Sequence, residues 1–155
     1  MTAAKGKGAG PLWKCSLCGR EFANRNQTHT CAPLGSLAAH FAGRDATIEA
    51  LFRSLLAMVR SNGPVTVLPE KTRIAFQTRM SFMAVAPRQT HLIGHFVFAR
   101  RVPSPRFRKI ETISARNVVH HFCLEREDEL DAEFESWIRE AYAVGRQEHL
   151  AKKSP

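Results

Sequence analysis

The amino-acid sequence predicts an α+β fold in which a small antiparallel sheet is flanked by an N-terminal and a C-terminal amphipathic helix. Two segments, 48–59 and 130–142, repeat apolar residues at the spacing of one helix face. Between them lie short runs rich in β-branched and aromatic residues, separated by turns. A third observation places a small module before this domain, because three of the four cysteines fall within residues 15–31.

Composition divides the 155 residues into five segments. We expect a disordered N-terminus over 1–12, a cysteine-containing module over 13–32, a linker over 33–45, an α+β domain over 46–147 and a loose tail over 148–155. The linker has room for one helical turn, from Ser36 to Phe41. The hydrophobic content of 44% is ordinary for a globular protein.

Each predicted helix has one apolar stripe and recognisable ends. Asp45 or Thr47 can cap the first helix, and Asn62-Gly63-Pro64 ends it. Acids gather in the first turn of the second helix, as the helix dipole favours. The stripe of the first helix consists of Ile48, Leu51, Phe52, Leu55, Leu56 and Val59. The stripe of the second consists of Leu130, Phe134, Trp137, Ile138, Ala141 and Tyr142.

Six extended segments are predicted between the two helices. Their ranges are Val65–Leu68, Arg73–Gln77, Phe82–Ala86, His91–Ala99, Ile110–Ile113 and Val118–Leu124. Residues 100–109 include Pro103 and Pro105 and are expected to form a loop. An antiparallel meander of these strands would bury one face under the two helices.

The cysteine-containing module has the spacing Cys15-x2-Cys18-x10-His29-x-Cys31. Zinc takes thiolate and imidazole ligands in tetrahedral structural sites, and a C-x2-C turn presents two sulfurs to one point. Residues 13–31 bury too little apolar surface to fold unaided, so metal binding would supply the stability. We therefore predict a Zn²⁺ site with Cys15, Cys18, His29 and Cys31 as ligands, and His40 is the alternative fourth ligand.

The tight His29-x-Cys31 pair limits what this module can do. Residues at i and i+2 do not share a helix face, so this pair converges only from extended or turn backbone. The module is thus predicted to be a zinc ribbon or knuckle, with Trp13 and Phe22 packed around its hairpin. A base-reading finger would place its second ligand pair on a helix, and four protein ligands leave no open position for catalysis. We expect a structural site.

The net charge of +9 is concentrated in one segment of the chain. Between Lys71 and Arg116 there are ten Lys and Arg residues and a single acid, Glu111. A localised cationic excess is typical of proteins that bind an anionic partner. It is equally compatible with a solvated face and with ion pairs to the acidic second helix. The candidate anion-binding residues are Lys71, Arg73, Arg79, Arg100, Arg101, Arg106, Arg108 and Lys109.

The sequence contains no recognisable catalytic constellation, such as a Ser-His-Asp order, a phosphate-cradling glycine loop or paired carboxylates. His120 and His121 fall in one strand, so one must face the core and the other the opposite face. No Asp or Glu is expected at a strand position near them. An enzyme that used Lys71, Arg73 and His120 around a phosphate-bearing substrate would need these side chains to converge in one cleft. We expect a protein that is not an enzyme.

Four other side chains in or beside the predicted sheet fit core positions. Phe76, Phe82 and Phe107 interleave with the charged residues and could stack on bases, but in a small sheet such aromatics are more often core. Cys123 is expected to be a small buried apolar residue.

Several stretches together resemble a known family. They are GPVTVLPEKTRIAFQTRMSFMAVAPR, the late strand with His120, and ELDAEFESWIREAY, and the resemblance covers about residues 40–146. In these stretches the chain is similar to the family known as domain of unknown function 5655, of which some relatives carry an N-terminal WxCxxC…NQxHxC segment. The resemblance implies a compact α+β domain with no established activity and no catalytic residues. Its N-terminal part favours His29 over His40 as the fourth ligand.

These observations predict a non-enzymatic, zinc-containing protein that binds DNA, RNA or another polyanion through a basic sheet and loop surface. The alternative is an adaptor that binds a protein or a small ligand, and a homo-oligomer is compatible with either. No apolar run reaches the roughly 18 residues of a membrane span, and the N-terminus lacks the apolar core of a signal peptide. We therefore expect a cytoplasmic protein without a membrane partner, in which reduced cysteines favour metal over disulfides.

Overall fold

The computed structural model describes residues 10–27, 29, 31 and 34–151. Most of the predicted disordered N-terminus (residues 1–9) and the end of the predicted tail (residues 152–155) lie outside the described residues. Residues 28, 30, 32 and 33, which belong to the predicted module and linker, lie outside them as well.

The described chain forms a two-stranded hairpin, a six-stranded sheet and four α-helices, which confirms the predicted α+β class. The strands are β1 (Trp13–Lys14), β2 (Glu21–Phe22), β3 (Thr66–Pro69), β4 (Ile74–Gln77), β5 (Ser81–Pro87), β6 (Leu92–Phe98), β7 (Lys109–Ser114) and β8 (Asn117–Leu124). The helices are α1 (Leu37–Phe41), α2 (Ala46–Arg60), the 3-10 helix η1 (Glu127–Glu129), α3 (Ala132–Gly145) and α4 (Glu148–Ala151).

The larger sheet is antiparallel throughout, with the strand order β3-β4-β5-β6-β8-β7. The sequence predicted a simple meander, but β8 lies between β6 and β7. Alternate residues of β8 are buried, whereas β7 has no buried residue. The more apolar strand therefore takes the inner position, and the polar strand becomes the edge.

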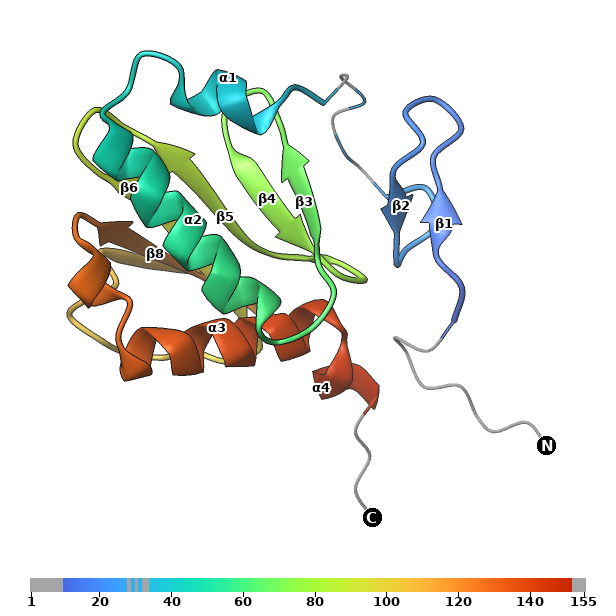
Figure 1. Ribbon diagram of the computed structural model, residues 1–155. Coiled ribbons are helices and arrows are strands. Elements are labelled where there is room, and N and C mark those ends of the chain that lie inside the picture. Colours follow the sequence, from blue (N-terminus) through green and yellow to red (C-terminus); the bar gives the residue numbers. More distant parts are fainter. Residues whose placement is uncertain (1–9, 28, 30, 32–33, 152–155) are drawn as a thin grey trace.

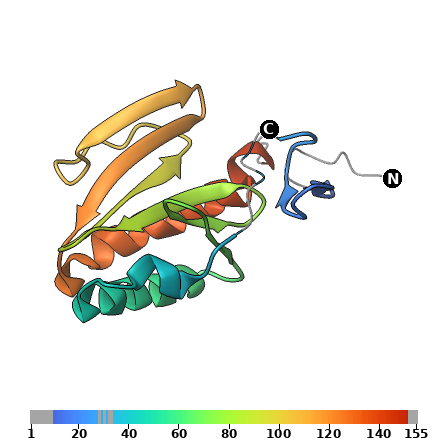
Figure 2. The same ribbon diagram turned by 90° about the horizontal axis from the view of Figure 1, so that it is seen from above.

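Helices α2 and α3 lie on the same face of this sheet, as Figures 1 and 2 show. The Asp45 carboxylate caps α2 by accepting a hydrogen bond of 2.9 Å from the Thr47 backbone N–H. Asp131 caps α3 in the same way through the Phe134 N–H. The apolar stripe predicted for α2 is buried, as is that predicted for α3 from Phe134 onward. The core lies between these helices and the sheet.

The opposite face of the sheet, which we call the open face, has no helix over it (Figure 2). Side chains of neighbouring strands that are paired in register point to the same face. One such row crosses the sheet on the open face and consists of Leu68, Ala75, Ala84, His95, His121 and Lys109. Two of its members are alanines and two are histidines, so the side chains on this face are short on β4 and β5 and polar on β6 and β8.

The β1–β2 hairpin with its cysteine ligands, which we call the metal module, packs against the β3–β4 end of the sheet (Figure 1). The Arg20 guanidinium lies 3.0 Å from a carboxylate oxygen of Glu70. The Gln77 side-chain amide donates a hydrogen bond to the backbone carbonyl of Glu21. These contacts, which join residues far apart in the sequence, dock the module on the α+β domain.

Two segments outside the main elements differ in how well they were predicted. The linker contains α1, which is the expected helical turn, and the Ser36 hydroxyl accepts a hydrogen bond of 3.1 Å from the Ala39 N–H at its start. Residues 148–151 form the short helix α4, where the sequence predicted a loose tail. Among the helices of the described residues, none has the length and apolar character that crossing a membrane requires.

Candidate functional site

The structure brings together the four predicted metal ligands, Cys15, Cys18, His29 and Cys31. Each contributes one ligand atom, and all four atoms lie within 4.8 Å of one another. The Cys15 and Cys31 sulfurs are 3.8 Å apart, and the His29 Nε2 lies 3.3 Å from the Cys18 sulfur and 3.2 Å from the Cys31 sulfur. Thiolates that each lie about 2.3 Å from a tetrahedral ion are separated by about 3.8 Å. The group therefore fits a four-coordinate metal ion.

Local backbone geometry explains why these residues converge. Strands β1 and β2 pair Trp13 with Phe22, and the turn between them carries the first two cysteines. Gly19 closes this turn with a φ of +79°, a conformation that favours glycine, and its N–H donates to the Cys15 carbonyl. The Phe22 ring centroid lies 4.4 Å from that of His29. Trp13 and Phe22 thus pack on the hairpin, as the sequence predicted, and both rings also lie beside His29.

A backbone carbonyl orients His29, the histidine of this candidate metal site. The His29 Nδ1 lies 2.6 Å from the carbonyl oxygen of Gln27, to which it donates its hydrogen. This contact leaves Nε2 as the unprotonated nitrogen directed toward the sulfurs, which is how outer contacts commonly orient a metal-bound imidazole.

The electrostatics of the cysteines suit a cation. Backbone N–H groups of Cys18 and Leu17 lower the pKa of Cys15 to about 6. Loss of water around the Cys31 sulfur, together with the neighbouring Cys15 sulfur, raises the pKa of Cys31 to about 11. The first thiolate thus forms readily, and further negative charge beside it is resisted unless a metal ion neutralises it.

His40, the alternative fourth ligand, is not part of this group. It lies on α1, where its Nε2 donates a hydrogen bond of 2.7 Å to the backbone carbonyl of Glu70. The ring instead holds the linker against the end of β3. The geometry therefore favours His29.

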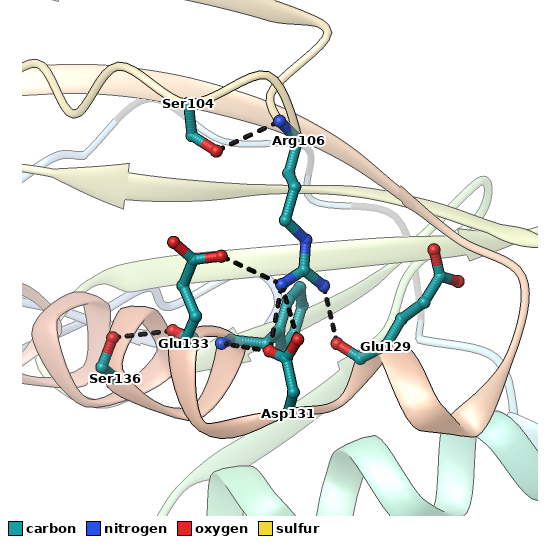
Figure 3. Close-up of polar contacts among 7 residues, drawn as sticks. Ser104, Arg106, Glu129, Asp131, Glu133 and Ser136 are labelled. Carbon is teal, nitrogen blue, oxygen red and sulfur yellow. Dashed lines mark hydrogen bonds and ion pairs between the residues drawn. The ribbon is translucent and has the colours of Figure 1, made fainter.

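Two of the predicted anion-binding arginines are paired with the closing helix α3. The Arg100 guanidinium makes two hydrogen bonds of 2.9 Å to the Glu140 carboxylate. Arg106 contacts both oxygens of Asp131, at 3.0 and 3.1 Å, and Glu133 at 3.2 Å (Figure 3). Bidentate and multiple contacts of this kind use the donors that a phosphate would need. Arg100 and Arg106 therefore serve mainly to tie the loop before β7 to α3.

The remaining candidate cations are divided among separate places. Arg79 lies in the β4–β5 turn and donates a hydrogen bond to the Gln147 side chain. Lys109 pairs with Glu111 at 3.2 Å. Lys71 and Arg101 are exposed and have no ion-pair partner among the described residues. The eight predicted anion-binding residues thus do not form one contiguous surface.

Arg73 and Arg108, by contrast, line one pocket on the open face. This pocket has a volume of about 380 Å³. Arg73 immediately precedes β4 and Arg108 immediately precedes β7, so they reach the pocket from strands on opposite sides of it. Its remaining lining residues are Ala84, Val85, Ala86, Ile93, Gly94, His95, His121 and Phe122.

The two strand histidines face opposite ways, as expected, and the one on the open face has a carboxylate partner. His120 is fully buried, accepts a hydrogen bond from the Val102 N–H and lies against Phe98 and Phe107. The His121 Nε2 lies 2.7 Å from a carboxylate oxygen of Glu111 on β7. The expectation that no acid occupies a nearby strand position was therefore wrong. The pairing of β7 with β8, which places Lys109 opposite His121, creates this contact.

An enzyme that used Lys71, Arg73 and His120 would need these three side chains in one cleft, and the position of His120 rules this arrangement out. Arg73 lies at the pocket on the open face, whereas His120 faces the core on the other side of the sheet. Lys71, Arg73 and His120 therefore do not converge in one cleft. The pocket contains His95 and His121 instead, and neither His95 nor the His121 partner Glu111 was among the predicted site residues.

The aromatic residues of the basic segment belong to the core. Phe76 and Phe82 are fully buried and Phe107 is 7% exposed, so these rings do not offer a stacking surface for bases. Cys123 is half-buried rather than fully buried, and its strand position places it on the open face with His121.

Comparison with known proteins places the chain in a family. No curated protein and no solved structure matches it. The model of one family, described as Domain of unknown function (DUF5655), matches residues 37–145, which run from α1 to the end of α3. The sheet, both long helices and the open-face pocket fall within this range, and the metal module precedes it. The chain therefore belongs to the DUF5655 family, as its sequence resemblance indicated.

Proposed function

We propose that this protein is a non-enzymatic, zinc-stabilised module that binds nucleic acid or another polyanion on the open face of its sheet. The observation that carries the proposal is the pocket on that face, where Arg73 and Arg108 flank an apolar floor and no helix intervenes. Guanidinium groups donate hydrogen bonds in a planar fork that matches phosphate oxygens.

Zinc is the ion that best suits the metal module. Three sulfurs and one imidazole nitrogen are ligands typical of structural zinc, and all four positions are filled by protein. An ion held in this way stabilises the short β1–β2 hairpin, and it has no open position for a substrate. Free thiols of this kind persist in a reducing compartment, so we propose that the protein works in the cytoplasm.

The open face carries a cationic excess even after its ion pairs are considered. Glu70 neutralises part of the charge of Arg73, and Glu111 that of Lys109. Arg108 has no carboxylate partner among the described residues and is exposed. An anionic strand that lies across this face would therefore meet Arg108 without displacing an existing ion pair. Arg100 and Arg106, held by α3, are excluded from the proposed surface.

Salt-dependent binding tests this proposal. We expect fluorescence anisotropy with a labelled oligonucleotide to show binding at low salt, with log K falling by about 0.7 to 0.9 per contacted phosphate for each unit of log salt concentration. Arg108→Glu should weaken binding at least tenfold, because it replaces the unpaired guanidinium by a like charge.

A matched control separates a local contact from net charge. Arg53→Glu changes the net charge by the same amount on the exposed side of α2, where Arg53 pairs with Glu49 at 2.7 Å. This variant should retain nearly full affinity. Absence of binding at low salt, or an equal loss in both variants, would contradict the proposed surface.

A further inference from the structure

Small residues line much of the floor of the pocket on the open face. Ala84 and Ala86 occupy successive open-face positions of β5, and Ile93 on β6 is paired with Ala86. The volume of about 380 Å³ lies at the lower end of the range of roughly 300–1,000 Å³ typical of small-molecule sites. The floor therefore accommodates a small apolar or aromatic group of a ligand.

Two cationic side chains reach this floor from opposite sides. Arg73 shares the Glu70 carboxylate with Arg20, so its charge is incompletely neutralised. Arg108 has no carboxylate partner among the described residues. One guanidinium fork satisfies a carboxylate or an internal phosphodiester, whereas a phosphate monoester carries a charge of about −1.5 to −2 and three terminal oxygens. Two arginines at one pocket match the monoester best.

Two histidines supply hydrogen-bonding groups at the same pocket. The ring centroids of His95 and His121 are 5.8 Å apart. Glu111 engages the His121 Nε2, which leaves Nδ1 as the other hydrogen-bonding atom of that ring. Burial lowers the pKa of His95 to about 4, with added repulsion from Arg73 and His121, so this ring is neutral at physiological pH. The neutral imidazole of His95 can donate to or accept from the sugar or base of a nucleotide.

We propose that this pocket binds a terminal phosphate monoester of a nucleotide, with the phosphate held by Arg73 and Arg108 and the nucleoside over Ala84, Ala86 and Ile93. The proposal rests on the proposed function and deepens it, because it assigns the end of a strand, or a free mononucleotide, as the group that the open face recognises. A long polyanion would then be held at one end by the pocket and elsewhere by its charge.

Calorimetric titration of the full chain tests the pocket directly. A nucleoside 5′-monophosphate should bind at least tenfold more tightly than the matching nucleoside and more tightly than inorganic phosphate. Arg108→Gln should reduce this affinity at least tenfold, whereas Arg100→Gln, whose guanidinium is held by Glu140, should leave it unchanged. Equal affinity for the nucleoside and its monophosphate would overturn the assignment.

A second variant tests the floor without altering charge. Ala86→Leu fills the pocket from an open-face position and should abolish mononucleotide binding while circular dichroism remains native. Retention of mononucleotide binding in both Arg108→Gln and Ala86→Leu would also overturn the assignment.

Oligonucleotides distinguish failure of this inference from failure of the proposed function. We expect strands with a 5′- or 3′-terminal phosphate to bind more tightly than the same strand with hydroxyl ends, and Ala86→Leu to remove the difference. Equal binding of all three strands with a normal salt dependence would refute the pocket assignment and leave polyanion binding intact. Monoester-dependent binding of mononucleotides without salt-dependent binding of any strand would refute polyanion binding and support the pocket.

Discussion

At position 95, an ionisable ring lies within a strand face that no helix covers. Burial, with Arg73 and His121 nearby, lowers the pKa of His95 from 6.5 to about 4, and Glu111 opposes this shift. The folded protein therefore protonates His95 only near pH 4, whereas the unfolded chain does so near 6.5. Stability from this group is present above pH 6.5 and is lost as the pH falls toward 4.

We expect His95→Gln to flatten the pH dependence of the free energy of unfolding between pH 6.5 and 4. Since one pKa unit corresponds to about 1.4 kcal/mol, the wild type should lose roughly 2 to 3 kcal/mol more than the variant over this range. Urea denaturation at several pH values measures the difference. His91→Gln, which removes a ring from the β5–β6 turn, controls for the loss of one histidine. Parallel curves for wild type and His95→Gln would contradict the expectation.

At the scale of elements, Arg106 connects the loop before β7 to the start of α3. Its guanidinium donates to Asp131, to Glu133 and to the backbone carbonyl of Glu129 (Figure 3). It also lies 5.3 Å from the ring centroid of Trp137. Because Asp131 caps α3, this one side chain stabilises the helix start, the loop and part of the core boundary together.

Arg106→Ala should therefore lower the free energy of unfolding by about 2 kcal/mol, through lost charge-assisted hydrogen bonds and lost packing on the aromatic ring. The comparison is Arg53→Ala on α2, an exposed ion pair whose loss should cost less than about 0.5 kcal/mol. Thermal or urea denaturation distinguishes them, and equal stability of the two variants would show that Arg106 is only a surface residue.

Elements with a local signal were predictable, and those that depend on tertiary pairing were not. The apolar stripe and Asp45 cap located α2 within a few residues, and the cysteine spacing identified the four side chains that converge at the candidate metal site. The insertion of β8 between β6 and β7 is decided by which strand buries more apolar surface, and no local pattern reports it.

The residues of the open-face pocket that were not predicted were missed for the same reason. Glu111 was inside a predicted strand, but its contact with His121 depends on the register of β7 and β8. The pairing of Arg100 and Arg106 with α3 had an available signal, the acids of that helix. Sequence composition alone could not predict which arginines or lysines these acids would pair with.

At the scale of the whole molecule, the metal module and the α+β domain have separate sources of stability. Strands β1 and β2 have two residues each and little core, whereas the domain has a large buried cluster. We expect one zinc per chain by elemental analysis and none in Cys15→Ser. Hydrogen exchange in that variant should lose protection in residues 13–27 while α2, α3 and the six-stranded sheet keep theirs.

The fourth cysteine provides the control for this experiment. Cys123→Ser alters a thiol on the open face, away from the ligand group, and should retain one zinc. Full metal content in Cys15→Ser would contradict the ligand assignment, and general loss of protection would contradict the independence of the domain.

Glu70 stands between these two parts of the chain, with one oxygen on Arg20 and the other on Arg73. A carboxylate divided in this way cannot fully neutralise either guanidinium. If the hairpin detached, Arg20 would leave with it, and the Glu70 carboxylate would pair with Arg73 alone. Arg73, at the edge of the open-face pocket, would then attract anions less strongly. Docking of the hairpin therefore modulates the electrostatic potential of a pocket to which the hairpin contributes no lining residue.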